Sequence, residues 1–521
     1  MYDVIIKNAK IIDGTGATAY NSDIAIKNGK IASIGTFKET NAKESYDAKG
    51  LIAAPGFIDI HTHSDKNLIA FPKSESRLLQ GITTEIGGNC GISPFPVASR
   101  YLDDLKLYEG GSLPYEWHDA KGFLDFLEDK GTGTNFGCLV GHGSIRLAVM
   151  GYSSQKATKE ELEKMRNLAK NAIKQGAFGM STGLIYPPGS YADANEIIYI
   201  LKALQEEGGY YATHMRNERE YLIDSVKESI AVSKASGVPL QISHHKSLHM
   251  PLWGKAVYET TALIEDAKGQ GMDIYCDQYP YAASATTLSS DIPSWAFEGG
   301  IDKLIERLND PFTRAKLKED SDHSHKGRWH CIKISWLASE KNRWMIGKDV
   351  EEIGKMTGKS AADTVFDLVA EERNMVNEVD FGMSEEDIEF IMKKEYVMPG
   401  SDGESYPLDF DGQPHPRNFG TFPRIISHYQ RERKLFTLEE SIRKMTSLPA
   451  RRIGIEDRGT IAEGKWADIV LFNYDEIEDT PTYENPKKAC KGIKKVFVNG
   501  VLAASDGAVT NLRAGKILRK T

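Results

Sequence analysis

The stretch from Pro55 to Asp65 contains a His-x-His pattern directly after an apolar, β-rich run. The run Phe57–Ile60 predicts a strand, and His61 and His63 follow it. Residues two apart in an extended chain point to the same face, so both imidazoles can converge on one point. Such a pair suits a divalent metal ion. The alternative is two half-exposed polar residues where a strand ends, so a metal site requires further ligands elsewhere.

Further side chains of metal-binding types follow other predicted strands. Cys90 has a glycine on each side of it at Gly88 and Gly91, which lets the backbone turn sharply. Three more candidates follow the fifth, sixth and eighth predicted strands, namely His214, His244 and Asp402. Each alone is a weak signal, because a single buried histidine is more often an ordinary core residue. Their coincidence at strand ends predicts a metal centre built from several elements.

The elements that position these residues alternate between strand-like and helical patterns. Eight strands are predicted, at Phe57–Ile60, Thr83–Ile86, Phe136–Val140, Phe178–Ser181, Tyr210–Thr213, Leu240–Ser243, Met272–Cys276 and Tyr396–Met398. The clearest helix runs from Lys159 to Gln175, with a capping box of Thr158 and Glu161 before a stop at Gly176. This alternation predicts an α/β fold, a parallel (β/α)₈ TIM-like barrel, whose active site lies at the carboxyl ends of its strands.

Both ends of the chain predict β-structure. Alternating apolar residues flank Asn-Gly at 28–29 and again at 499–500, which is a strong hairpin signal. Neither end can bury enough surface alone, so we expect the two to pair into one small β-sandwich. The predicted division is a β-sandwich of residues 1–54 and 450–521, with the barrel of residues 55–449 inserted between them.

One segment is too long for a simple barrel crossover. Residues 286–349 contain four tryptophans with little periodicity, at positions Trp295, Trp329, Trp336 and Trp344. We expect an insertion that covers the barrel mouth as a lid, the usual reason for a long irregular connection. The alternative is a peripheral subdomain with its own small core.

Composition limits the class of protein. The chain has 521 residues, of which 40% are hydrophobic and 27% charged, with a net charge of −9. These values are typical of a soluble globular protein and argue against nucleic acid as a partner. No stretch is apolar and long enough to span a membrane, and the N-terminus has no secretory pattern. Five cysteines make no disulfide framework, so we expect a cytoplasmic, reducing compartment.

With these motifs in place, the sequence resembles the metal-dependent amidohydrolase superfamily, and within it the N-acyl-D-amino-acid deacylases (D-aminoacylases). The finer resemblance is carried by segments spread over most of the chain, namely Gly88–Gly91, Val140–Arg146, Met180–Tyr186, His214–Glu218, Ser243–Lys246, Ser401–Gly403, His415–Arg417 and Gly420–Arg424. It implies a barrel with a terminal β-sandwich. The implied reaction is zinc-dependent hydrolysis of an N-acyl-D-amino acid to a carboxylate and a D-amino acid.

The resemblance also implies a ligand set. One tightly bound zinc would be held by Cys90, His214 and His244, and a second, weaker position would be lined by His61, His63 and Asp402. In related hydrolases a carboxylated lysine from the fourth strand often bridges two metals. The fourth strand here ends in Gly179-Met-Ser-Thr182 without lysine, so Cys90 would replace that bridge. This departure argues against a hydantoinase or dihydroorotase.

Catalytic and substrate-binding roles follow in the same way. Asp402 would act as general base and then general acid, the alternative being a pure metal ligand. Arg417 and Lys246 would bind the substrate carboxylate, unless Arg417 forms a structural ion pair and Lys246 lies on a solvated loop. A tyrosine, Tyr281 or Tyr279, would contact the substrate.

Other residues and other functions remain open. His142 and Arg146 are candidates for supporting the site. The histidines clustered in the insertion, His323, His325 and His330, are expected in a solvated turn, the alternative being a metal site there. A cyclic-amide hydrolase, a D-dipeptide-type amidase and a non-catalytic scaffold are the alternative functions. Retention of every proposed ligand argues against the scaffold. A small-molecule substrate is the expected partner, and association into a homo-oligomer is left open.

Overall fold

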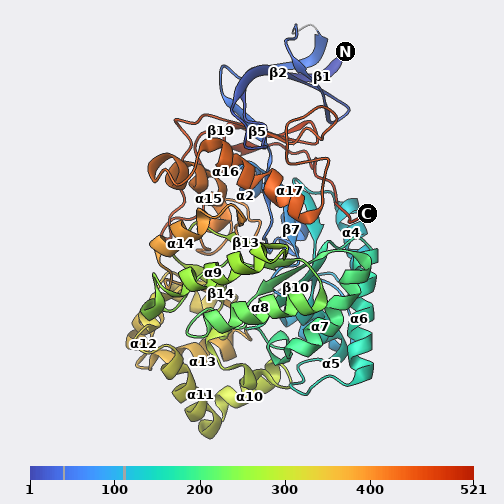
Figure 1. Cartoon of the computed structure of the whole chain (residues 1–521). Helices are drawn as coiled ribbons and strands as arrows, with labels where there is room; N and C mark the ends of the chain where they lie inside the picture. Colours follow the sequence, from blue (N-terminus) through green and yellow to red (C-terminus); the bar gives the residue numbers. More distant parts are fainter. Residues whose placement is uncertain (39–40, 109–112) are drawn as a thin grey trace.

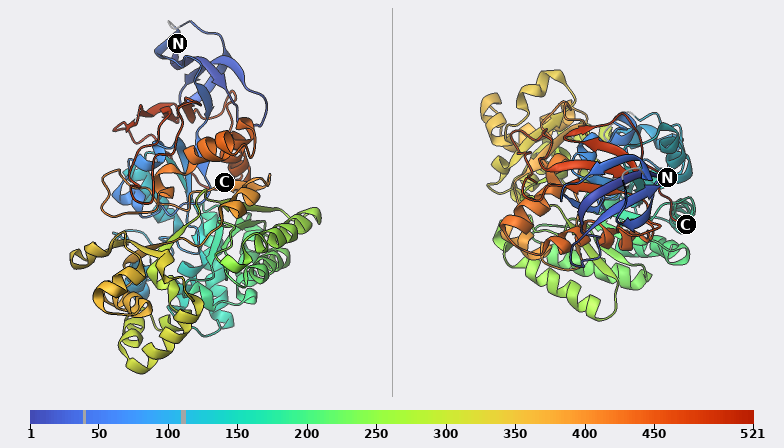
Figure 2. Two further views of the ribbon diagram at one scale, coloured as in Figure 1. Left: turned by 90° about the vertical axis from the view of Figure 1, so that its left-hand side faces the viewer. Right: turned by 90° about the horizontal axis from the view of Figure 1, so that it is seen from above.

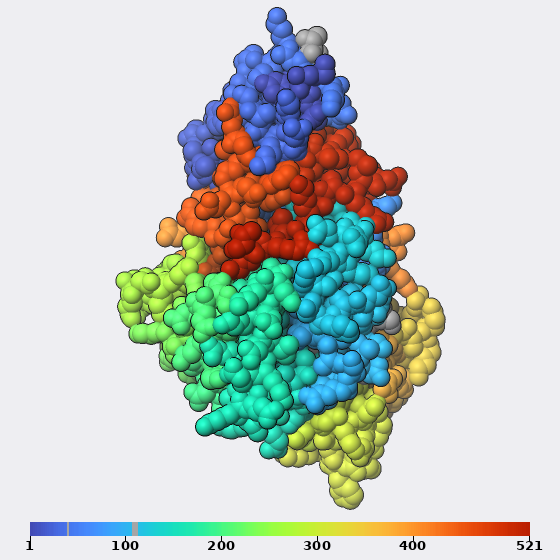
Figure 3. Space-filling view, turned by 90° about the vertical axis from the view of Figure 1, so that its right-hand side faces the viewer, coloured from blue at the N-terminus to red at the C-terminus, as the bar shows by residue number. Residues whose placement is uncertain are grey.

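The computed structural model of the chain describes residues 1–38, 41–108 and 113–521. A β-rich layer containing both the first and last strands lies at one end of the molecule, and the barrel lies below it (Figure 1). Helices α10 (Ile301–Asn309) and α11 (Pro311–Ser324) lie at the opposite end. In the space-filling view the C-terminal segment, in red, lies between the blue N-terminal strands and the cyan and green barrel (Figure 3).

Eight parallel segments among the described residues form the barrel. They are β6 (Phe57–Asp59), β7 (Ile82–Gly87), β8 (Asn135–Cys138) with its continuation β9 (Val140–Gly141), β10 (Gly179–Gly183), β11 (Tyr210–His214), β12 (Leu240–Ile242), β13 (Ile274–Gln278) and β17 (Val397–Pro399). Beyond β6 and β17 the ring closes through parallel bridging of Thr62 and Gly403. The predicted barrel and its eight strands are therefore confirmed.

Helices surround this barrel. They are α1 (Asn67–Ala70), α2 (Glu75–Leu78), α3 (Leu102–Tyr108), α4 (Ala120–Lys130), α5 (His142–Met150), α6 (Lys159–Lys174), α7 (Ala194–Glu207), α8 (Leu222–Ser236), α9 (Ala256–Gly269), α14 (Glu385–Met392), α15 (Arg417–Arg424), α16 (Leu438–Met445) and α17 (Ser447–Ile453). The predicted capping box opens α6, because the Thr158 hydroxyl accepts from the Glu161 N–H while the Glu161 carboxylate accepts from the Thr158 N–H. Its apolar face, which includes Met165 and Ile173, is buried.

The two ends of the chain meet in one sheet of nine described strands. They are β1 (Tyr2–Ile11), β2 (Tyr20–Lys27), β3 (Lys30–Gly35), β4 (Ala42–Asp47), β5 (Ile52–Pro55), β18 (Ile469–Phe472), β19 (Ile493–Val498), β20 (Val501–Ser505) and β21 (Ala508–Val509). Antiparallel pairing of β5 with β18 joins the ends. A separate hydrophobic cluster, which includes Ile24, Leu471 and Phe497, underlies this layer. Both predicted Asn-Gly turns are present, with positive φ at all four residues.

The terminal segments also contact the barrel. Helix α17 crosses the expected division at residue 450 and lies against β6. At the very end of the chain, Phe136 of β8 donates to the Lys516 carbonyl at 3.0 Å and accepts from the Leu518 N–H at 2.7 Å. Part of the segment 450–521 therefore packs against the barrel, in addition to the part that joins the terminal sheet.

The long connection between β13 and β17 forms a subdomain of its own. Its strands β14 (Ser284–Thr287), β16 (Val376–Asp380) and β15 (Ile332–Leu337) pair antiparallel, and α12 (Val350–Thr357) and α13 (Ala361–Glu371) join α10 and α11 around them. The segment therefore extends beyond the expected end at residue 349. Its buried residues belong to the same hydrophobic cluster as the barrel core, which disfavours an independent small core. It lies at the end away from the terminal sheet (Figure 2).

The sequence predicts neither a membrane span nor a disulfide framework. Among the described residues, no helix has the length and apolar character needed to cross a membrane. All five cysteines lie in the described part of the chain, and each carries a free thiol. Cys331 is half-buried and the other four are buried.

We expect Thr158→Ala to lower the free energy of unfolding by about 1 kcal/mol, because the mutation removes a side-chain cap from α6. Urea denaturation followed by circular dichroism measures the effect. Thr158→Ser, which keeps the hydroxyl, is the control and should remain close to the parent. An unchanged midpoint in the alanine variant would contradict the role of the cap.

Candidate metal centre

Three of the candidate ligands occupy strained backbone positions. Cys90, His244 and Asp402 have φ values of 51°, 35° and 50°. The left-handed region is uncommon for residues with a Cβ and costs on the order of 1–3 kcal/mol, so it persists only where the surroundings enforce it. All three follow barrel strands at their carboxyl ends. The sharp turns bring their side chains together over the barrel end.

The loop that carries Cys90 is pressed against the ends of neighbouring strands. A Cβ added at Gly88, which has φ +72°, would overlap the carbonyl oxygen of Leu139. A Cβ added at Gly183 would overlap the carbonyl oxygen of Cys90 itself. The Ser181 hydroxyl also accepts from the Gly91 N–H at 2.9 Å. Glycine is therefore required at these positions to place the thiol over the end of β10.

Among the described residues, one group of four side chains could hold a metal ion, namely His61, Cys90, His244 and Asp402. The Cys90 Sγ lies 3.4 Å from Nε2 of His61 and 3.4 Å from Nε2 of His244. Oδ1 of Asp402 lies 3.2 Å from Nε2 of His61. All four are buried, so a thiol, two imidazoles and a carboxylate face one small volume.

A second group shares His244 with the first and adds His214 and Glu218. Oε1 of Glu218 lies 3.0 Å from Nδ1 of His244 and 2.7 Å from Nζ of Lys246. The ring nitrogens of His214 make no hydrogen bond among the described residues, although Oε2 of Glu218 lies 3.5 Å from Nε2. A buried imidazole whose ring nitrogens have no hydrogen-bond partner is typical of a metal ligand.

The charges around the centre favour the thiolate form of Cys90 and the carboxylate form of Asp402. Burial favours the neutral thiol of Cys90, but His61 and His244 outweigh it and hold the pKa well below its usual value. Burial likewise opposes ionisation of Asp402, yet Arg417 and His61 hold its pKa well below the ordinary range. A thiolate beside imidazoles and a carboxylate is a donor set that fits zinc.

The structure brings all six predicted ligands to one place. The contacts among them differ from the two predicted sets of three ligands. His61 lies beside Cys90 and His244, and His63 lies at the edge, with Nε2 3.0 Å from Oδ1 of Asp402. The ring of His214 is 4.4 Å from that of His244, measured between centroids. The assignment of each ligand to one of two ions stays a prediction.

Sequence reasoning missed two acidic residues that orient the ligands. Asp277, the penultimate residue of β13, accepts from Nδ1 of His61 at 2.9 Å and from the backbone N–H of His244 at 2.7 Å. Glu218 contacts both His214 and His244. Sequence signals for both residues were present. Asp277 stands at the end of the seventh predicted strand, and Glu218 follows the candidate ligand His214 by four residues.

The predicted substrate-binding cations are both buried in ion pairs. Nη1 of Arg417 lies 2.8 Å from Oδ2 of Asp402, and Lys246 pairs with Glu218. Lys246 is 3% exposed, so it does not lie on a solvated loop. The two cations flank the ring of Tyr279, with 4.9 Å from Arg417 and 5.6 Å from Lys246 to its centroid.

Of the two candidate tyrosines, Tyr279 lines the cavity above the centre. Tyr281 is absent from the described lining of that cavity and contacts His415 and Arg424, at 5.2 Å between ring centroids and 5.1 Å from guanidinium to centroid. The geometry therefore favours Tyr279 over Tyr281 for contact with a ligand.

Other predicted histidines fall outside the centre. His142 and Arg146 both pair with Glu196, at 3.0 Å and 2.6 Å, and join α5 to α7. His323 and His330 are exposed as expected, but His323 lies in α11 and His330 in a 3-10 helix (Trp329–Cys331) rather than in a turn. The same expectation is wrong for His325, which is 4% exposed and stacks on Trp329.

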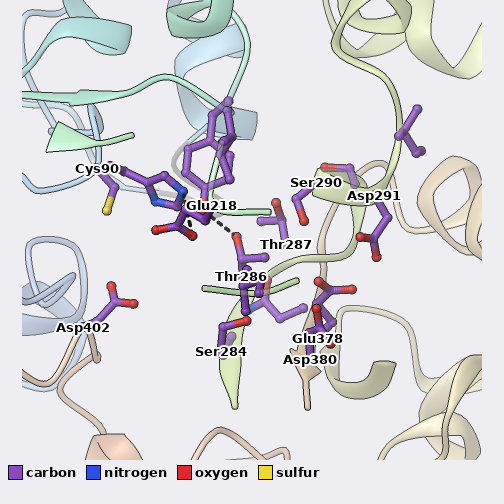
Figure 4. Close-up of a pocket in the computed structure, with 18 of the residues that line it drawn as sticks. Cys90, Glu218, Ser284, Thr286, Thr287, Ser290, Asp291, Glu378, Asp380 and Asp402 are labelled. Carbon is purple, nitrogen blue, oxygen red and sulfur yellow. Dashed lines mark hydrogen bonds and ion pairs between the residues drawn. The ribbon is translucent and has the colours of Figure 1, made fainter. Parts of the chain in front are cut away.

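A cavity of about 990 Å³ opens above the centre. Cys90, Glu218 and Asp402 lie on one side of it in Figure 4, and residues of the inserted subdomain lie on the other. Trp295 and Trp336 of that subdomain also line it. The insertion thus forms a wall of the cavity at the barrel mouth.

A model of the amidohydrolase family matches residues 44–504. D-aminoacylase of Alcaligenes xylosoxydans xylosoxydans is 36% identical over 100% of this chain and 98% of that protein. N-acyl-D-glutamate deacylase of the same organism is 34% identical over 99% of this chain and 96% of that protein. The chain therefore belongs to the amidohydrolase family, and within it to the D-aminoacylase group. The predicted resemblance is confirmed.

Solved structures agree. A crystal structure of D-aminoacylase superposes with a TM-score of 0.84 at 34% identity, covering 100% of both chains. An N-acyl-D-glutamate deacylase from Bordetella bronchiseptica, complexed with zinc and a phosphonate inhibitor, gives 0.84 at 31% identity over 100% of both chains. A hydantoinase from Arthrobacter aurescens gives 0.53 at 17% identity and shares the fold alone.

We expect Cys90→Ala to lose most of the divalent metal that the protein retains through purification, because the thiolate is the only soft donor of the described cluster. Mass-spectrometric metal analysis of the purified variant measures this. Cys490→Ala is the matched control, since that thiol is also buried and donates to the Phe419 carbonyl, outside the candidate metal cluster. Equal metal content in both variants would contradict a ligand role for Cys90.

Proposed function

We propose that the protein is a zinc-dependent deacylase that hydrolyses N-acyl-D-amino acids to a carboxylate and a free D-amino acid. The observation that carries the proposal is the juxtaposition of two features in one cavity. A buried cluster of thiol, imidazole and carboxylate donors lies beside two cations that flank Tyr279. Full-length similarity to D-aminoacylase supports the same substrate class.

For the metal, the proposed tight site uses Cys90, His214 and His244, and the weaker position is lined by His61, His63 and Asp402. When bound, zinc supplies Lewis acidity, which lowers the pKa of water and polarises the scissile carbonyl. The orphaned ring nitrogens of His214 and the favoured thiolate of Cys90 support this assignment. The glutamate and aspartate behind the histidines fix the ring orientations, as such partners do in metal sites.

Asp402 is the proposed proton-transfer residue. Arg417 contacts its Oδ2 while its Oδ1 faces His61 and His63. The carboxylate takes the proton of the attacking water as the new C–O bond forms. It then delivers that proton to the nitrogen as the C–N bond breaks, which releases the D-amino acid as a neutral amine leaving group. The low pKa of Asp402 keeps the base ionised beforehand.

The substrate's α-carboxylate requires a buried positive charge with a donor that is still free. Nε of Arg417 is buried and makes no hydrogen bond among the described residues, whereas Nη1 lies 2.8 Å from Oδ2 of Asp402 and Nη2 donates to the Ala285 carbonyl at 3.0 Å. The Nε–H group can donate one charge-assisted hydrogen bond to a carboxylate. Lys246, whose Nζ lies 5.6 Å from the Tyr279 ring centroid, adds a second positive charge near the cavity and is paired with Glu218.

The experiment that tests the function is a hydrolysis panel. N-acetyl-D-methionine, its L-enantiomer and a hydantoin are assayed with and without a chelator. We expect turnover of the D-substrate alone and its loss on chelation. Hydrolysis of the hydantoin instead would replace the proposal with a cyclic-amide hydrolase, and no turnover at all would favour a scaffold.

Asp402→Asn should lower kcat on N-acetyl-D-methionine by about a hundredfold or more, because the amide cannot accept the proton. Metal analysis should show that the tight site, which does not use Asp402, is still filled. Steady-state kinetics on the metal-loaded variant measures the effect. Turnover within about threefold of the parent enzyme would rule out proton transfer by Asp402.

Arg417→Ala should lower kcat/KM for N-acetyl-D-methionine by about 10- to 100-fold more than for the corresponding D-methioninamide. A charge-assisted hydrogen bond contributes about 1.5–3 kcal/mol, and only the acid forms it. The amide substrate is the internal control for the loss of the ion pair with Asp402. Equal losses on both substrates would show that the role of Arg417 is structural.

A further inference from the structure

The wall of the cavity opposite the metal centre is a polar face of the inserted subdomain. In its antiparallel ladder Thr286 of β14 pairs with Glu378 of β16, and Ser284 pairs with Asp380. Figure 4 shows Asp291, Glu378 and Asp380 grouped on the side away from Cys90 and Asp402. All three acids line the same cavity as the metal ligands.

Two of these three acids have cationic partners. Asp380 is contacted by Nη2 of Arg219 at 3.2 Å and by Nη2 of Arg328 at 2.9 Å. Oδ1 of Asp291 lies 2.6 Å from Nε2 of His325. Asp380 is thus neutralised by two guanidinium groups, while Asp291 has one oxygen engaged.

Glu378 differs from both. It is 2% exposed, and no described cation forms an ion pair or hydrogen bond with it. Oε2 of Glu378 and Oδ2 of Asp291 accept no hydrogen bond from any other described residue. The two carboxyl groups are hydrogen-bonded to each other, and burial together with Asp291 raises the pKa of Glu378 well above its usual value. The pair therefore shares one proton, which a cationic ligand can replace.

Tyr186 contacts both this wall and the metal centre. The Thr286 hydroxyl lies 2.9 Å from the Tyr186 hydroxyl, and the Tyr186 ring packs edge-on against His214 with centroids 5.1 Å apart. The hydroxyl of Ser290 lies next to Asp291 on the same side (Figure 4). Glu378 and the residues of the metal centre therefore line one continuous cavity from different sides.

We propose that Glu378 and Asp291 form a subsite for a cationic substrate side chain, so that N-acyl-D-arginine and N-acyl-D-lysine are the substrate class of this enzyme. The proposal rests on the proposed deacylase function and specifies its substrate. A guanidinium offers several N–H donors in a plane, which matches two adjacent carboxyl oxygens. An acidic side chain would meet the negative charge that this acid pair carries, so N-acyl-D-glutamate is disfavoured.

The test compares kcat/KM of the metal-loaded enzyme for N-acetyl-D-arginine with that for N-acetyl-D-citrulline, which has the same shape without the charge. N-acetyl-D-glutamate and N-acetyl-D-methionine complete the panel. We expect arginine to exceed citrulline by roughly tenfold or more, as for a buried charge-assisted hydrogen bond, and glutamate to be the poorest. The arginine-to-citrulline ratio should fall towards one in Glu378→Gln and in Asp291→Asn.

Glu319→Gln is the matched control, because Glu319 also lines the cavity but is exposed at its rim. It should keep the ratio of the parent, which separates the subsite from a general effect of negative charge. Hydrolysis of N-acetyl-D-methionine with equal rates for arginine and citrulline would overturn the subsite alone. Failure to hydrolyse any of the four would overturn the deacylase function and the subsite with it.

Discussion

The hydrogen bonds that close the barrel between β6 and β17 determine the geometry of the centre. The Asp402 N–H donates to the His61 carbonyl and the His63 N–H donates to the Gly403 carbonyl, both at 2.8 Å. The backbone of the base is thereby tied to the backbone of two candidate ligands. The positions of these three side chains follow from strand pairing, which is stiffer than any contact between flexible side chains. The strained φ of Asp402 is maintained by this pairing.

A layer of buried acids behind the centre has a matching role. Asp277 accepts hydrogen bonds from His61, His244 and Gln241, and Glu218 contacts His214, His244 and Lys246. Each carboxylate orients an imidazole and raises its basicity, which strengthens a metal ligand. Burial opposes ionisation of Glu218, but Lys246 and the two histidines hold its pKa well below its usual value, so the acid stays ionised. The centre is therefore held by charge balance as well as by strand geometry.

Much of this could be predicted from the sequence because the informative signals were local. Asn-Gly turns, a capping box and histidines directly after strands depend on a few neighbouring residues. Glu218 and Asp277 were missed because an acid near a strand end looks like a solvated residue until its partners are known. The choice between Tyr279 and Tyr281 and the pairing of Lys246 depend on contacts between distant segments. The extent of the insertion to Asp380 was missed because its strands pair with one another rather than with the barrel.

The pairing of β5 with β18 has a consequence for the order of assembly. A ribosome releases Ile52–Pro55 long before Ile469–Phe472, with residues 56–468 between them. Until then one edge of the N-terminal strands has no partner, and the cluster around Ile24 lacks Leu471 and Phe497. Exposed edges of this kind favour pairing with other chains. The last strands synthesised therefore complete the terminal sheet, and until they emerge the free edge of β5 is open to pairing with other chains.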